Sequence, residues 1–185
     1  EFRKNKKTNH EMVYLFLADG FEDMEAVVPF DLMKRAGIEV ETVGIGGKNI
    51  KSAHGLSVTA EISENEVDFE KAEAFVFPGG WPGAKNLKNS ETVNNAITFA
   101  LHNDIIIGAI CASPGYVLSG TGALSGKKYT CFPGFEVPEG EYTAEKVEID
   151  GKLITANGPA SAKEFALALV SAINGNLEGI EEFSE

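Results

Sequence analysis

Cysteines, histidines and long apolar runs are all scarce in this sequence. It has two cysteines and three histidines, His10, His54 and His102, among 185 residues. Two cysteines are too few for a disulfide scaffold, so we expect a reducing, cytoplasmic setting. The histidines share no spacing with cysteines or carboxylates that indicates a metal site. No apolar run reaches the ~18 residues that a membrane span needs, so we expect no contact with a membrane core.

Basic residues are also in the minority. The chain has 16 lysines and arginines against 28 aspartates and glutamates, which gives a net charge of −12. Such a chain repels phosphate, so nucleic acids and anionic membranes are poor partners. Hydrophobic residues make up 43% of the chain, enough for the core of one domain, expected over residues 12–185. Residues 1–11 match no helical or strand period and are expected to be a disordered leader or native tail.

Short apolar runs alternate with amphipathic stretches along the rest of the chain. Strands are expected at residues 13–18, 38–43, 72–77, 105–110, 128–132, 145–149 and 152–156, and a hairpin at 50–60. Helices are expected from about residue 21 to 36, over 90–102, over 112–119 and from a Ser161/Glu164 capping box to about 174. Pro29 fits only near a helix start. This alternation predicts an α/β fold with a mainly parallel sheet.

The stretch from 103 to 122 contains the most informative pattern. An apolar run rich in β-branched residues ends at Cys111, and a helix is expected to begin at once. Small residues two positions either side of the cysteine, Ala109 and Ser113, suit the sharp strand-to-helix turn of a nucleophile elbow. The helix dipole would favour a thiolate there. A cysteine at the end of an apolar run is more often a small buried side chain, and the stretch alone leaves both interpretations open.

Three chemical features directly follow three of the predicted strands. Glu25 comes soon after the first strand, Gly79 and Gly80 follow the third, and Cys111 ends the central one. In a parallel sheet these positions meet at one edge, where the ligand crevice lies. A thiol, a carboxylate and backbone N–H donors are the components of a carbonyl-addition site. Trp81 beside the glycines either lines a pocket or covers the loop.

The carboxylate constrains the chemistry, because an ionised Glu25 next to Cys111 would oppose formation of the thiolate. If Glu25 contacts the sulfur, we expect it to be protonated, to donate a hydrogen bond and to shuttle a proton. The alternative is an acidic residue at a helix start that faces water.

Residues 18–27, 77–80, 108–114 and 157–166 (ADGFEDMEAV, FPGG, GAICASP and NGPASAKEFA) together resemble the ThiJ/PfpI superfamily. The nearest branch is that of the Parkinson's-disease-associated protein deglycase and its bacterial relatives. The resemblance implies a flavodoxin-like three-layer sandwich with helices on both faces, usually a homodimer. It also implies that Cys111 is a reactive, oxidisable thiol with Glu25 as its protonated partner. Gly80 and the backbone near Cys111 and Ala112 would bind an oxyanion.

Two departures from the family pattern limit the chemistry. The peptidase branch has a histidine directly after the cysteine, where this chain has Ala112, so proteolysis by a Cys–His pair is disfavoured. The deglycase branch often has a histidine where this chain has Phe132, a candidate pocket residue together with Trp81. Proton transfer then depends on Glu25 or water. Cys131 is expected to point away from the side that Phe132 faces and to be structural rather than a redox partner of Cys111.

Three functions compete on these grounds. The first is a glyoxalase or deglycase that needs no cofactor and acts on small reactive carbonyls such as methylglyoxal through Cys111 and Glu25. The second is a redox-sensing stress protein or chaperone, in which peroxide oxidises Cys111 stepwise. The third, amide or peptide hydrolysis, is supported only by membership of the superfamily.

Overall fold

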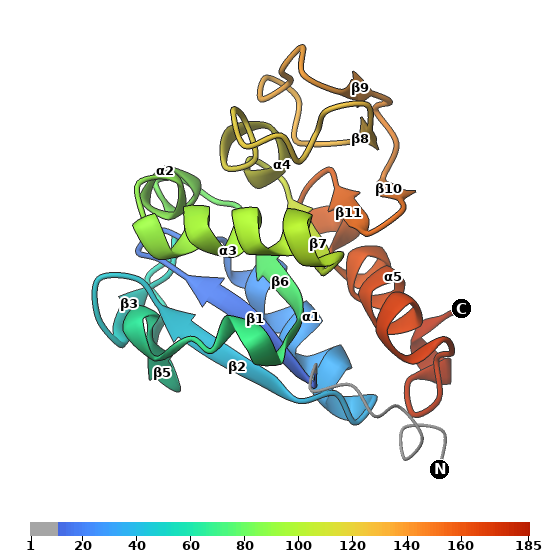
Figure 1. The fold of residues 1–185 in the computed structure, drawn as a ribbon. Helices are drawn as coiled ribbons and strands as arrows, with labels where there is room; N and C mark the ends of the chain where they lie inside the picture. Colours follow the sequence, from blue (N-terminus) through green and yellow to red (C-terminus); the bar gives the residue numbers. More distant parts are fainter. Residues whose placement is uncertain (1–10) are drawn as a thin grey trace.

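A seven-stranded sheet runs through the centre of the protein (Figure 1). The computed structural model describes residues 11–185, and the strand order is β10-β11-β7-β6-β1-β2-β5. Every neighbouring pair is parallel except β10 and β11. The strands are β1 (Met12–Leu17), β2 (Val40–Gly44), β5 (Ile62–Ser63), β6 (Ala72–Phe77), β7 (Ile106–Ile110), β10 (Val147–Asp150) and β11 (Leu153–Ala156). The three central strands are almost wholly buried, as the apolar runs predicted.

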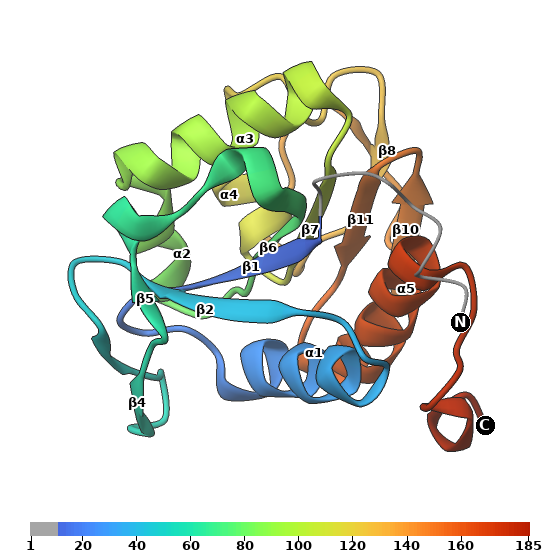
Figure 2. The ribbon, with the colours of Figure 1, turned by 60° about the horizontal axis from the view of Figure 1, so that its bottom comes forward.

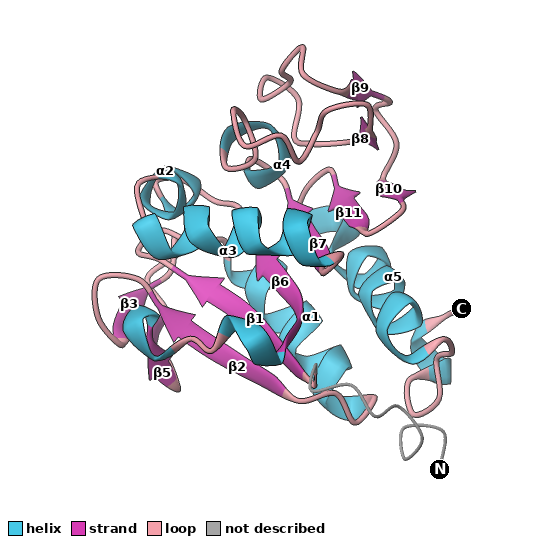
Figure 3. Ribbon diagram, viewed as in Figure 1, coloured by secondary structure: helices cyan, strands magenta, loops and turns pink. Residues whose placement is uncertain are grey.

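Helices cover both faces of this sheet (Figures 2 and 3). Helices α1 (Asp23–Arg35) and α5 (Ala162–Asn174) pack on one face and enclose one apolar core. The other face carries a second core, covered by α2 (Gly83–Lys88), α3 (Glu91–Asn103) and the single turn α4 (Ser113–Tyr116). The expected three-layer, flavodoxin-like α/β sandwich is therefore confirmed.

Two small sheets lie outside the main one. Strands β3 (Asn49–Lys51) and β4 (Ser57–Thr59) form the expected antiparallel hairpin. Strands β8 (Lys128–Tyr129) and β9 (Glu141–Tyr142) form a two-residue parallel pair, so the strand expected over 128–132 is much shorter. Short 3₁₀ turns are η2 (Glu64–Glu66), η3 (Phe69–Lys71), η4 (Pro159–Ser161) and η5 (Glu181–Phe183).

Two local expectations about helices were wrong. Pro29 lies inside α1 and is buried, because the packing of this helix against α5 and the sheet outweighs the missing backbone hydrogen bond. The capping box at the start of α5 does not form. The hydroxyl of Ser161 donates instead to Asn157 Oδ1 at 2.6 Å, because the η4 turn leads directly into the helix.

Most of the expected leader or tail, residues 1–11, lies outside the described residues. Glu11, the one described member, donates its backbone N–H to the carbonyl oxygen of Lys71 beside β1. Within residues 11–185, no helix is both long enough and apolar enough to cross a membrane.

Candidate active site

Cys111 occupies a strained turn between β7 and α4. Its φ is +66°, a value that costs a non-glycine residue free energy and is found mainly at functional sites. The backbone fixes the turn from both sides. The Cys111 N–H donates to Ala156 O at 2.9 Å, and the Cys111 carbonyl accepts from Phe132 N at 2.8 Å. The Ser113 hydroxyl also donates to Pro78 O at 2.5 Å. The chain thus forms the expected elbow.

The helix behind this elbow is shorter than the sequence suggested. The expected helix over 112–119 is only the four residues of α4. A single turn has few aligned peptide dipoles, so the helix dipole can favour a thiolate at Cys111 only weakly. The polar groups that act on the sulfur lie closer. They are the backbone N–H groups of Gly80 and Ala112 and the carboxyl of Glu25.

Glu25 lies in the first turn of α1 and is fully buried. Its Oε1 accepts a hydrogen bond from the Gly79 N–H at 3.0 Å. Within residues 11–185, its buried Oε2 has no nitrogen or oxygen partner. The remaining hydrogen-bonding neighbour of the carboxyl is the Cys111 thiol. Glu25 therefore faces the cysteine rather than water, as expected if the two side chains act together.

Burial governs the protonation of this pair. It raises the pKa of Glu25 to about 8, and the charge of Glu22 adds to the effect. The pKa of the Cys111 thiol rises to about 12, first through burial and then through the charge of ionised Glu25, while the Gly80 and Ala112 N–H groups lower it. The raised pKa favours the protonated form of Glu25 at neutral pH, and a neutral carboxyl does not repel a thiolate as an ionised one would.

Gly79 follows β6 and lies in close contact with the end of β7 and the start of α1. A Cβ on this residue would lie 2.6 Å from Cys111 Cβ, 2.7 Å from Glu25 Oε1 and 2.8 Å from Ile110 O. Only glycine fits without moving the thiol or the carboxyl. The Gly79 N–H already bonds Glu25, which leaves the N–H groups of Gly80 and Ala112 as the donors beside the sulfur.

We expect Gly79→Ala to destabilise the fold by about 1–3 kcal/mol, because the added methyl group overpacks a site enclosed by backbone and buried side chains. Urea unfolding measures this loss. Gly158→Ala is the matched control, because its Cβ would meet only the exposed Phe132 ring at 3.2 Å, which can move aside. Equal losses in both variants would contradict the close packing around Gly79.

Two exposed aromatic side chains belong to residues next to this site. Trp81 follows Gly80, is 50% exposed and packs edge-on against Tyr116, with ring centroids 5.0 Å apart. Phe132 is 45% exposed, and its backbone N–H bonds Cys111. Neither side chain has an acidic or basic group that could transfer a proton in the reaction. Cys131 is fully buried and is not in a disulfide, in keeping with the structural role expected for it.

The sequence analysis missed a polar group at the start of α1. His54, from the turn between β3 and β4, has its Nδ1 2.9 Å from Asp23 Oδ1 and 4.0 Å from Glu22 Oε1. The Glu22 and Asp23 carboxyls and the His54 ring thus form one polar group at this end of the helix. No sequence spacing signalled this group, since the hairpin brings His54 to two residues about thirty positions earlier in the chain.

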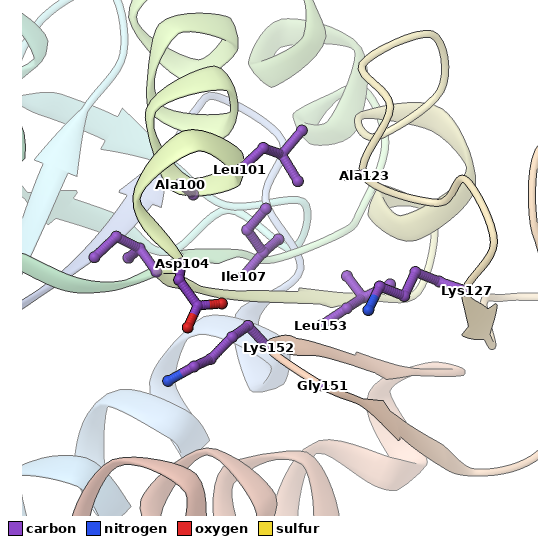
Figure 4. Close-up of a pocket in the computed structure, with 10 residues that line it drawn as sticks. Ala100, Leu101, Asp104, Ile107, Ala123, Lys127, Gly151, Lys152 and Leu153 are labelled. Carbon is purple, nitrogen blue, oxygen red and sulfur yellow. The ribbon is translucent and has the colours of Figure 1, made fainter.

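A separate cavity of about 530 Å³ lies at the other end of β7 (Figure 4). Leu101, Ile107 and Leu153 line it together with Lys127 and Lys152. Because Cys111 follows the carboxyl end of β7, this cavity is no part of the candidate active site.

Comparison with known proteins matches residues 11–172 to the model of the DJ-1/PfpI family. The chain belongs to the DJ-1/PfpI family. The match covers all the strands of the central sheet and both residues of the thiol–carboxyl pair. The resemblance deduced from the four sequence motifs is therefore confirmed.

Individual DJ-1/PfpI relatives match over most of this chain. DJ-1 homolog B of Arabidopsis thaliana is 34% identical over 89% of the chain, although the chain spans only 38% of that protein's length. A Schizosaccharomyces pombe protein named glutathione-independent glyoxalase DJ-1 is 31% identical, over 87% of this chain and 90% of its own. The crystal structure of Drosophila melanogaster DJ-1beta superposes with a TM-score of 0.88 at 32% identity, covering 95% of this chain and 96% of that one.

Proposed function

We propose that the protein is a cysteine-dependent glyoxalase or deglycase that acts on small reactive carbonyls such as methylglyoxal. The observation that carries this proposal is the fully buried Glu25 carboxyl in hydrogen-bond contact with the Cys111 thiol, where burial raises the pKa of the carboxyl to about 8. The Gly80 and Ala112 N–H groups beside the sulfur add donors for a developing oxyanion. The glyoxalase name of the Schizosaccharomyces pombe relative supports the same reaction class.

The proposed reaction begins with addition of the Cys111 sulfur to the aldehyde carbon of methylglyoxal. The thiol proton passes to water while Glu25 gives its proton to the aldehyde oxygen, so that a hemithioacetal forms and Glu25 is left as the carboxylate. The Glu25 carboxylate then removes the hydrogen from that carbon to give an enediolate, and returns a proton to the neighbouring carbon. Proton exchange between the two oxygens completes a thioester. Water hydrolyses the thioester to lactate, and the thiol and the Glu25 proton are restored.

The test is to follow methylglyoxal consumption by the wild-type protein while quantifying lactate. We expect one lactate for each methylglyoxal consumed, over many turnovers per protein molecule. Consumption that stops at one equivalent without lactate would mean reversible thiol addition only, and would overturn the glyoxalase proposal. Free aldehyde and glycated amino acids should be assayed separately, because scavenging of free aldehyde mimics deglycation.

A redox-sensing stress role is the second candidate, favoured by one feature of the pair. A sulfinate on Cys111 would add two acceptor oxygens beside the protonated Glu25, whose Oε2 has no other oxygen or nitrogen partner. Peroxide treatment followed by intact-mass analysis should then show stepwise addition of two oxygens in the wild type and none in Cys111→Ser. A thiol that peroxide leaves unchanged would contradict this role.

We also propose that the protein is a homodimer that pairs through the outer surface at the start of α1. Met24, Val27 and Leu56 are each close to half exposed there, on the helix and on the adjoining hairpin. The hairpin is fixed to the helix, because the Ser52 hydroxyl donates to Asp23 Oδ2 at 2.7 Å. Exposed apolar side chains grouped in this way are typical of interaction surfaces.

The Val27→Glu variant should weaken this dimer at least about 100-fold, because a carboxylate would be desolvated at the centre of the contact. Sedimentation equilibrium measures the dissociation constant. Ile149→Glu, which changes an exposed apolar residue on β10 at the far edge of the sheet, is the control and should leave it unchanged. A wild-type protein that sediments as a monomer would refute the proposal.

A further inference from the structure

Three residues of the site close a ring of hydrogen bonds that includes Glu22. The Glu25 N–H donates to Glu22 Oε2 at 2.9 Å, and the Glu22 N–H donates to Gly79 O at 3.0 Å. The Gly79 N–H completes the ring by donating to Glu25 Oε1 at 3.0 Å. Each residue holds the next, so the position of the Glu25 carboxyl depends on the side chain of Glu22 as well as on Gly79.

Glu22 is part of the start of α1, and its side chain is largely buried. It is the N-cap of α1, and its side chain is only 13% exposed. Glutamate is an unusual N-cap, because a shorter aspartate or serine reaches the same N–H groups more easily. The longer side chain brings a second negative charge close to Glu25, where it acts on that carboxyl.

Among residues 11–185, few charged groups face the carboxyls of Glu22 and Glu25. The Glu25 carboxyl is faced by Cys111 from the β7–α4 turn and by Glu22 from its own helix start. Glu22 is in turn faced by His54 from the β3–β4 turn, at 4.0 Å, and His54 also pairs with Asp23. The His54 side chain is 72% exposed, so this outer group borders solvent.

We propose that Glu22 is a positioning residue for the reaction: its carboxylate fixes the backbone of Glu25 and presents a second negative charge to the Glu25 carboxyl. This inference rests on the proposed function of the Cys111–Glu25 pair. Glu22 touches neither the sulfur nor the substrate in this scheme. It acts through Glu25, by holding the acid in place and by favouring its protonated form.

Two nearly isosteric variants separate these contributions. Glu22→Asp keeps both a capping oxygen and the charge, whereas Glu22→Asn keeps the cap and removes the charge. Glu22→Ala removes both. The first readout is infrared difference spectroscopy of the protonated Glu25 carboxyl against pH, with Glu25→Gln as reference. The second is the pH profile of kcat and KM for methylglyoxal.

In Glu22→Asn we expect the Glu25 midpoint and the alkaline limb of kcat to move down by about one pH unit, since a nearby like charge is gone. Glu22→Asp, which keeps the charge on a shorter side chain, should keep both closer to the wild-type position than Glu22→Asn does. Glu22→Ala should show the same shift as Glu22→Asn and, at acidic and neutral pH, also lose about tenfold in kcat with little change in KM, because the acid is misplaced. Asp23→Asn, one residue along the helix, should leave the Glu25 midpoint unchanged.

The inference is overturned if the Asp and Asn variants give the same Glu25 midpoint, or if Glu22→Ala changes only the unfolding free energy. The infrared readout needs no turnover. If the wild type makes no lactate while the midpoint still shifts in Glu22→Asn, the proposed reaction has failed and the influence of Glu22 on Glu25 stands.

Discussion

The Cys111→Ser variant is expected to form lactate from methylglyoxal at least about 1,000-fold more slowly than the wild-type protein. A serine hydroxyl at the elbow keeps the backbone and nearly the same volume. Its oxygen is a far weaker nucleophile than the cysteine sulfur, and the Gly80 and Ala112 donors beside it cannot compensate. Initial rates of lactate formation at saturating methylglyoxal measure the loss.

Cys131→Ser is the matched control for this variant. It makes the same change in a second buried cysteine, whose burial also raises its thiol pKa to about 12. Its sulfur has no place in the proposed reaction, so turnover per folded molecule should stay close to wild type. Full turnover by Cys111→Ser, or equal losses in the two variants, would contradict a nucleophilic role for Cys111.

The Glu25→Gln variant is expected to be more stable than the wild type at pH 9, by on the order of 5 kcal/mol at most. The pKa of Glu25 is about 8 in the folded protein and 4.5 in the reference state. Between these values the folded state binds a proton that the unfolded chain has released. Raising the pH through this window therefore destabilises the wild type, and above pH 8 the buried carboxyl carries an uncompensated charge.

Urea unfolding at pH 5, 7 and 9 measures this difference. The stabilising effect of the substitution should be smallest at pH 5, which lies only half a unit above the reference pKa of 4.5, and should grow with pH, because glutamine does not ionise. Glu39→Gln, at an exposed glutamate before β2, is the control and should show no such trend. A pH-independent difference for Glu25→Gln would mean that Glu25 is not protonated in the folded state.

The sequence predicted the elbow because that motif is local. One short stretch contains a β-branched apolar run, a cysteine with small residues around it and an immediate helix start. The sharp turn from strand to helix gives Cys111 its positive φ. Glu25 and Gly79 could be placed beside it because parallel strands end at a common edge. Their order β7-β6-β1 makes the three positions neighbours.

Features that depend on tertiary contacts were not visible in the sequence. Pro29 is expected only near a helix start, yet it lies buried inside α1, a helix that packs against α5. Ser161 and Glu164 have the spacing of a capping box, but a neighbouring asparagine takes the serine hydroxyl. His54 reaches Asp23 only because a hairpin folds over the helix start. The role inferred for Glu22 depends on a ring through Gly79, which no short motif encodes.

Product analysis of Glu25→Gln at pH 7, with Cys111 alkylation by iodoacetamide measured in parallel, tests the proton relay through Glu25. We expect the variant to keep a thiol that can be alkylated and to add methylglyoxal reversibly, yet to form no lactate, because the proton relay is missing. Lactate formation at the wild-type rate would show that the reaction does not depend on the Glu25 acid.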